Sequence, residues 1–234
     1  MKNMTLMQHF SELKRRILWT MAIFVLAFVA GWYVAPFLQS FLTMPLINVW
    51  PDGALLYTSV TDGLMIQFSL GALFALLISV PVVFWHIWAF VKPGLKKSEQ
   101  NFIWPILFLS PVLFVAGAAF VFYFLFPIVF DFFIELNMAV DVPNIFLPDV
   151  RNYLHFVIKL LTVFGVAFQL PLVLIMLNKI GILHRSYVVK MRRYAIVFIV
   201  ILAAILTPPD VVSQLLLALP MWGLFELSIL FMRK

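Results

Sequence analysis

Long apolar stretches separated by short polar gaps make up almost the whole chain. Six stretches can be marked, at 17–35, 64–91, 102–126, 154–178, 194–206 and 211–231. About 20 apolar residues cross the hydrocarbon core of a bilayer as a helix, so six of them nearly exhaust the 234 residues. The strands of a membrane barrel would alternate apolar and polar positions, whereas these stretches are apolar on all sides. The pattern predicts an all-α membrane protein with a single six-helix transmembrane domain over residues 1–234.

Basic residues mark alternate gaps between these stretches. Of the 16 Lys and Arg residues, 14 lie before the first stretch, between the second and third, between the fourth and fifth, or after the last. The remaining gaps hold seven acids, with Arg151 as their only basic residue. Because Lys and Arg are enriched on the cytoplasmic side of membrane proteins, both termini are predicted to be cytoplasmic.

Composition agrees with this class. Apolar residues make up 65% of the chain and charged residues 11%. In soluble domains, roughly a quarter of all residues are charged. We interpret the net charge of +6 as topology signals and contacts with anionic membrane lipid, and expect no nucleic acid partner. The absence of cysteine excludes disulfides and thiolate metal sites.

Sequence motifs for catalysis or cofactor binding are lacking. The four histidines do not follow metal-site spacings, and neither a phosphate-binding G-x₄-GK[ST] loop nor a G-x-S-x-G elbow occurs. We therefore expect no enzyme activity, no metal and no cofactor. Lys14-Arg15-Arg16 before an apolar run resembles a signal peptide, but the run is too long and no A-x-A site follows, so a retained first helix is expected.

Prolines and one short stretch suggest irregular helices. Pro81, Pro105, Pro111 and Pro171 should each bend a helix by removing a backbone hydrogen bond, and bent helices packed together would form a concave bundle. The fifth stretch has about 14 residues before Pro208, or about 21 Å of helix against a hydrocarbon core of about 30 Å. Either the bilayer thins beside it or other helices shield its ends.

The gaps on the predicted outer side are long. Residues 36–63 carry proline and glycine turn signals and are expected to form a loop. Residues 127–153 are half apolar, so we expect them to fold back as a cap over the outer mouth. On the opposite side, apolar positions in 6–17 share one helical face, which predicts a segment at the membrane interface before the first span.

Three polar residues lie within the stretches. A buried amide must be hydrogen bonded, so Gln169 either meets a polar partner or mends the kink at Pro171. Lys159 is expected to extend its ammonium to the outer interface. Glu226 is expected to reach the cytoplasmic interface or to pair with a base.

Two acids stand out on the basic, cytoplasmic side. Glu12 and Glu99 are the only acids in those segments outside the apolar stretches. One interpretation is local ion pairing with neighbouring Lys and Arg, which contributes little when exposed. The other is recognition, because a carboxylate can accept two hydrogen bonds from the guanidinium of an arginine-bearing ligand.

Motifs along the whole chain resemble the TatC family, the multispanning subunit of the twin-arginine translocase. The motifs, in chain order, are His9-x-x-Glu12-Leu13-Lys14-x-Arg16, Met44-Pro45-Leu46, Trp88-Ala89-Phe90-x-x-Pro93-x-Leu95-x-x-x-Glu99, Phe164-Gly165-x-x-Phe168-Gln169-x-Pro171 and Leu206-Thr207-Pro208-Pro209-Asp210 with Ser213-Gln214. Each motif alone is weak, but together they are specific.

The resemblance implies a receptor in the cytoplasmic (inner) membrane for signal peptides with paired arginines. It implies export of folded proteins with single-span TatA/TatB-type partners, driven by the proton-motive force, with the chain as a homo-oligomer within a larger complex. Glu12 and Glu99 correspond to the family's signal-contacting glutamates. The residues that would shape the pocket around them are His9, Lys14, Arg16, Phe90, Pro93 and Leu95.

Two positions depart from the family pattern, and a second function class stays open. Lys14 stands where the family usually has Arg, and Gln169 where many relatives have Glu, which favours hydrogen bonding to a partner helix over a proton-linked role. The alternative is a small-molecule or ion secondary transporter with its site among Gln169, Lys159 and Glu226. A transporter should carry ionisable pairs near mid-membrane, whereas this sequence places one amide there.

Overall fold

The structure is a computed structural model that describes residues 6–51, 53–91, 103–138, 147–207 and 210–233. Apart from turns and one isolated bridge between Leu56 and Asp149, regular structure in these ranges is helical, so the all-α prediction is confirmed. Five helical stretches are long and apolar enough to cross a membrane; they are Phe10–Val49, Asp62–Phe90, Phe108–Asn137, Val150–Lys179 and Val211–Phe231.

The chain divides into two compact units. The first comprises Met1–Leu38 and Gln67–Val112, and the second comprises Gln39–Ile66 and Leu113–Lys234. The single domain, the concave bundle and the cytoplasmic termini stay predictions.

Helix α1 (Leu6–Val49) has 44 residues and is far longer than the first predicted stretch. Residues 36–49 are helical, so the expected loop beginning at residue 36 is wrong. Pro36 lacks the N–H that would bond the Trp32 carbonyl. Gln67 Nε2, from helix α2 (Asp62–Val91), donates to that carbonyl at 3.3 Å instead. A side chain of the neighbouring helix thus satisfies the carbonyl that proline leaves open, and α1 continues through it.

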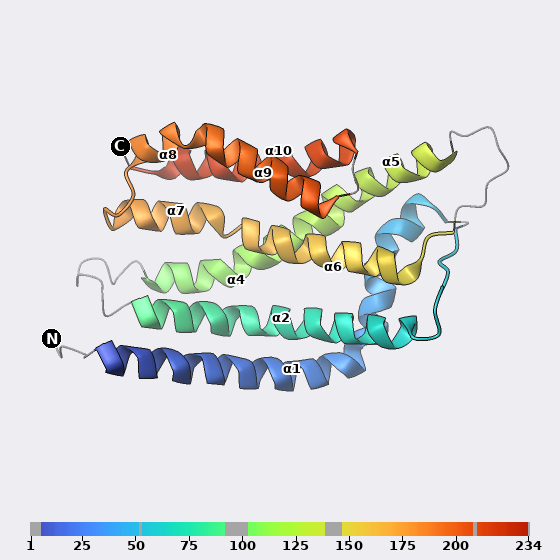
Figure 1. Ribbon diagram of the computed structural model, residues 1–234, viewed down its shortest axis with the longest axis horizontal. Coiled ribbons are helices and arrows are strands. Elements are labelled where there is room, and N and C mark those ends of the chain that lie inside the picture. The colour runs from blue at the N-terminus through green and yellow to red at the C-terminus, as the bar shows by residue number, and fades with distance from the viewer. Residues whose placement is uncertain (1–5, 52, 92–102, 139–146, 208–209, 234) are drawn as a thin grey trace. The chain divides into compact units, whose positions relative to one another are not determined.

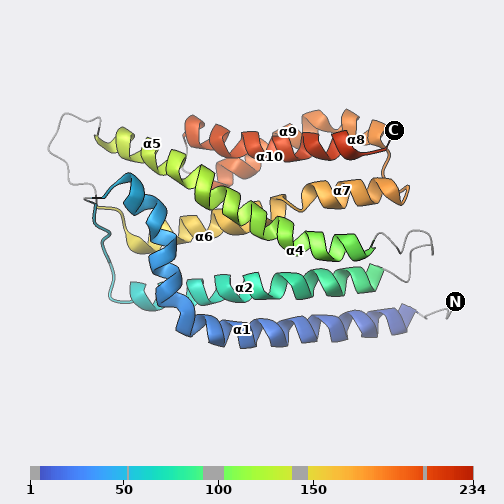
Figure 2. The same ribbon diagram turned by 180° about the vertical axis from the view of Figure 1, so that it is seen from behind.

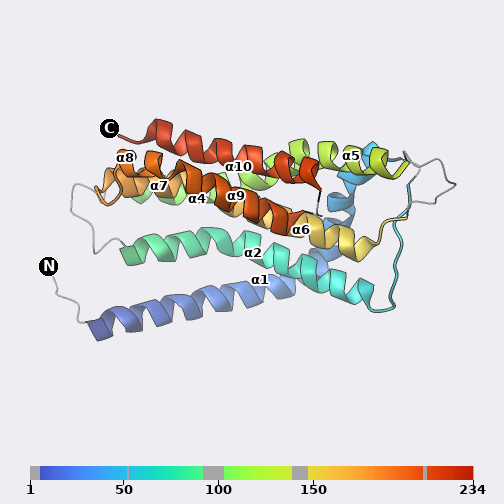
Figure 3. The same ribbon diagram turned by 45° about the horizontal axis from the view of Figure 1, so that its top comes forward.

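Helices α1 and α2 lie side by side in the first unit (Figure 3). Their backbones approach closely at Gly31, where an added Cβ would lie 2.8 Å from the Gly71 carbonyl oxygen. The Phe68 ring stacks on Phe28 and meets Trp32 edge-on, with centroids 5.9 and 4.9 Å apart. Small residues at the crossing let the aromatic side chains interlock beside it.

The third predicted stretch runs on as α4 (Ile103–Phe120), a π-helical segment η2 (Val121–Leu125) and α5 (Phe126–Met138), one after another (Figure 2). The predicted cap is therefore wrong for its first twelve residues, which continue the helix. The aromatic side chains of this part of the helix pack against the segment 150–167. The Phe130 ring lies on Tyr153 and Phe156 at centroid distances of 5.3 and 6.4 Å. Residues 139–146 lie outside the described ranges.

The fourth stretch is split at the expected proline. Two residues separate the end of helix α6 (Val150–Ala167) from α7 (Leu170–Lys179), which carries Pro171 in its first turn. The short α8 (Arg185–Lys190) then leads to α9 (Arg192–Leu206) and α10 (Val211–Phe231). Helix α10 packs against both α7 and α9 (Figure 1). The predicted sixth span is confirmed at both ends.

Helix α9 has 15 residues and confirms the short fifth helix. The last four carbonyls of a helix have no intrahelical partner. Here the backbone N–H and Oγ1 of Thr207 donate to the Ala203 carbonyl at 3.0 and 2.9 Å, and Lys159 Nζ of α6 donates to the Ile205 carbonyl at 2.7 Å. These bonds favour the interpretation in which neighbouring groups shield the end of this helix. The Lys159 ammonium, expected at the outer interface, is engaged by α9.

Candidate functional site

The best-defined charged contact of the first unit joins Glu12 and Arg16 in the second and third turns of α1. Arg16 Nε donates to Glu12 Oε1 at 3.1 Å, and its Nη2 donates to the same oxygen. The two side chains are 25% and 21% exposed. The spacing of four residues places both on one helical face. The local ion pair considered from the sequence is therefore present.

The other oxygen of Glu12 has a different environment. Glu12 Oε2 is shielded from solvent and makes no hydrogen bond to any residue that the structure describes. A buried carboxylate oxygen without a donor is rare, because losing water without gaining a partner costs about 1–3 kcal/mol. The arrangement leaves Glu12 able to accept a further N–H donor.

His86 connects this pair to α2. Its Nδ1 lies 3.5 Å from Arg16 Nη1. Because a guanidinium only donates, His86 Nδ1 is the acceptor side of this long contact. Sequence reasoning weighed His86 only as a metal ligand and missed it here. One signal was available in the sequence. His86 lies near the end of the second apolar stretch, and Arg16 lies just before the first, so two consecutive antiparallel spans would bring both residues to the same side of the membrane.

The other predicted recognition residues are only partly within the described ranges. Lys14 is exposed on α1, one residue before the exposed Arg15, and Phe90 lies half-buried in the last turn of α2. His9 lies in the first turn of α1. The predicted recognition residues Glu99, Pro93 and Leu95 lie outside the described residues.

Gln169 occupies the junction between α6 and α7. Its backbone N–H donates to the Val166 carbonyl at 2.9 Å, and its own carbonyl accepts from Val173 at 3.0 Å. The side chain is buried, with 5% of its surface exposed. It therefore sits at the proline break, as the sequence predicted, and its contact with a partner helix stays a prediction.

The two charged residues of the transporter alternative do not share a site. Lys159 bonds the carbonyl of Ile205 at 2.7 Å, and Glu226 pairs with Arg192 at 2.7 Å. These partners lie at opposite ends of α9, 13 residues or about 20 Å apart. The charges that would couple to an ion are thus engaged separately, which disfavours that alternative.

A second polar cluster ties the segment before α2 to the start of α6. Asp62 is 1% exposed, and its carboxylate accepts from the backbone N–H of Ser59 at 2.7 Å and lies 3.4 Å from Arg151 Nη1. The Thr58 hydroxyl lies 2.5 Å from Asp149 Oδ2. That hydroxyl, together with the backbone N–H of Asn152, lowers the pKa of Asp149. The charge pattern of the sequence places these acids and Arg151 on the same, outer side of the membrane. It does not indicate which acid contacts which partner.

Comparison with known proteins gives one consistent family. A family model described as the Sec-independent protein translocase protein (TatC) matches residues 8–220. A protein of that name from Rickettsia prowazekii is 38% identical over 233 residues, covering 98% of this chain and 93% of that protein. One from Haemophilus influenzae is 39% identical, covering 97% and 88%. A crystal structure of a twin-arginine translocase receptor, TatC, aligns at a TM-score of 0.85 and 29% identity, covering 95% and 97%.

Proposed function

The chain belongs to the TatC family of Sec-independent protein translocase proteins, and on this premise we propose that it binds signal peptides bearing paired arginines. As a multi-pass membrane subunit of that translocase, it is a component of protein transport. The proposal concerns which side chains perform the recognition.

Glu12 carries the proposal. One of its oxygens is held by Arg16, while the other accepts no hydrogen bond from the described part of the chain. A guanidinium from a signal peptide can donate to the second oxygen and displace Arg16 from the first, so that the pair becomes bidentate. Arg16 then has an acceptor at His86, 3.5 Å from its Nη1. In this exchange the site never holds a lone buried charge, which limits its electrostatic cost.

The second arginine of the signal is assigned to Glu99. We infer that Lys14, Arg16 and His9 contribute positive or donor groups that repel a cationic segment unable to satisfy both carboxylates. Phe90, Pro93 and Leu95 supply apolar contacts beside them. Under this proposal the chain recognises its ligand and catalyses no reaction.

The wider assembly follows the same premise. We infer that the chain works with single-span TatA/TatB-type subunits in the inner membrane, as one of several copies, and that the proton-motive force drives export. Gln169 supplies a hydrogen bond to a partner helix. The six helices act as a single domain with both termini in the cytoplasm.

Site-directed crosslinking to a twin-arginine signal peptide tests this function. Glu12→Ala and Glu99→Ala should each lower the crosslinking yield, whereas Glu135→Ala, which removes an exposed acid of α5, should leave it unchanged. Equal crosslinking in all three variants and the wild type would remove both glutamates from the recognition role. Substrate uptake into vesicles by the purified protein alone would instead support the transporter.

A further inference from the structure

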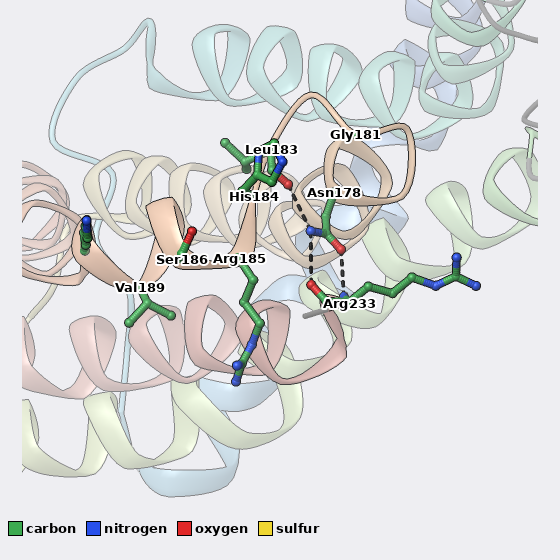
Figure 4. Close-up of a pocket in the computed structure, with 9 residues that line it drawn as sticks. Asn178, Gly181, Leu183, His184, Arg185, Ser186, Val189 and Arg233 are labelled. Carbon is green, nitrogen blue, oxygen red and sulfur yellow. Dashed lines mark hydrogen bonds between the residues drawn. The ribbon is translucent and has the colours of Figure 1, made fainter.

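A cavity of about 620 Å³ lies where the turn after α7 meets the end of α10 (Figure 4). Its basic lining residues are His184, Arg185, Lys190 and Arg233, and none of the nine described lining residues is acidic. All of these residues belong to the second unit. This positive cavity shares no residue with the Glu12 site, and the proposed recognition of paired arginines does not use it.

The cavity is held in shape by hydrogen bonds. Asn178 Oδ1 accepts from the Arg233 backbone N–H at 2.7 Å, and Asn178 Nδ2 donates to the Leu183 carbonyl at 2.9 Å. Figure 4 shows these bonds joining the turn to the chain beyond α10. Arg185 Nε donates to the Ile229 carbonyl at 3.1 Å, which fixes its guanidinium while leaving its outer N–H groups available. The Arg185 guanidinium is therefore positioned before any ligand arrives.

The position of the cavity identifies the kind of anion. The membrane-spanning stretches Val150–Lys179 and Val211–Phe231 both end beside it, so it lies at the level of lipid head groups. Apolar residues close in sequence to its lining residues are exposed, with Ile182 68%, Leu230 71% and Phe231 69% exposed. A soluble anion would use the cations alone, whereas a phospholipid would also cover these apolar side chains with its acyl chains.

We propose that this cavity binds the phosphate head group of an anionic phospholipid. The phosphate would accept hydrogen bonds from Arg185 and Lys190, and the acyl chains would lie along the exposed end of α10. Basic pockets between spanning helices on the cytoplasmic side have the chemistry for this role. A lipid seated here would join α7, α8 and α10 at the membrane surface.

Native mass spectrometry of the full chain in detergent tests the site. With phosphatidylglycerol and phosphatidylcholine as probes, the wild type should retain phosphatidylglycerol preferentially. Lys190→Gln and Arg185→Gln should each weaken that binding by about fivefold, the expected contribution of one interfacial cation. Lys190 makes no side-chain hydrogen bond within the described chain, so its variant should fold even if Arg185→Gln does not.

Arg193→Gln is the matched control, because it removes one exposed cation of the same region outside the cavity. Its guanidinium lies 5.0 Å from the Tyr194 ring centroid. The site is overturned if Arg193→Gln weakens phosphatidylglycerol binding as much as Lys190→Gln, or if the two lipids bind equally. Displacement of the lipid by millimolar inorganic phosphate would reassign the cavity to a soluble anion.

Discussion

Arg16 holds only one of the two carboxylate oxygens of Glu12, while the other oxygen is buried and accepts no hydrogen bond within residues 6–51, 53–91, 103–138, 147–207 and 210–233. The intrahelical pair and the recognition role are therefore compatible. A partly exposed pair of this kind contributes about 0.3–0.5 kcal/mol in a helix, which a bidentate hydrogen bond to an incoming arginine exceeds.

Arg16→Gln should relax selectivity for the second arginine of the signal. Without Arg16, a peptide with one arginine no longer has to displace an internal competitor, so its affinity should rise by about twofold, the factor that the 0.3–0.5 kcal/mol pair represents. Binding of single- and twin-arginine peptides, measured by fluorescence anisotropy, gives the ratio. Arg15→Gln removes the adjacent exposed charge and serves as control. An equal change in both variants would mean that net charge alone matters.

Gly31→Ala should destabilise the first unit. The new Cβ would lie 2.8 Å from the Gly71 carbonyl oxygen, so α1 and α2 must separate, at a cost of about 1–3 kcal/mol. Thermal unfolding in detergent measures the loss. Gly223→Ala is the control, since a Cβ there meets nothing within 4 Å and α10 should gain slightly. Equal melting temperatures for the two variants would contradict the close approach.

Much of the fold follows from the apolar pattern, and the misses have physical causes. The second and sixth spans agree with α2 and α10 because long apolar runs flanked by charges have only one helical solution in a membrane. The end of the first helix was missed because Gln67, distant in sequence, satisfies the carbonyl that Pro36 leaves open. No local signal announces such a bond.

Some features of the candidate site could likewise be predicted from the sequence, and others depend on tertiary packing. Glu12 was predicted to be a recognition residue because it is an acid in a basic segment. Its pairing with Arg16 follows from helical spacing. The contact with His86 depends on how α1 and α2 pack, which spacing along the chain does not specify. The partners of Asp62 and Lys159 likewise come from tertiary structure.

Lys159→Met should loosen the end of α9. The variant keeps the apolar stem but loses the hydrogen bond to the Ile205 carbonyl, which should cost about 1 kcal/mol. Hydrogen exchange should become faster in the last turn of α9 and stay unchanged in α10. Lys159→Arg retains a donor and should restore protection. Unchanged exchange in Lys159→Met would remove the capping role.

Asp149→Asn should make the stability of the folded protein less dependent on pH in the acid range. The pKa of Asp149 is lowered in the folded protein by the Thr58 hydroxyl. A carboxyl with a lowered folded pKa stabilises the protein above its unfolded pKa of about 3.9, and this stabilisation is lost as pH falls through the folded pKa. Melting temperatures of wild type and variant should converge below about pH 4. Asp131→Asn, on the exposed side of α5, should keep the wild-type profile.

A double-mutant cycle between Glu12 and the signal peptide tests the central claim most directly. Peptide affinity is measured for wild type and Glu12→Gln, each with a twin-arginine peptide and with peptides in which one arginine is replaced by glutamine. Direct pairing predicts a coupling energy of about 1.5–3 kcal/mol for one of the two arginines, as for hydrogen bonds to charged groups. Additive effects for both arginines would contradict the assignment of Glu12 as the carboxylate that binds the signal.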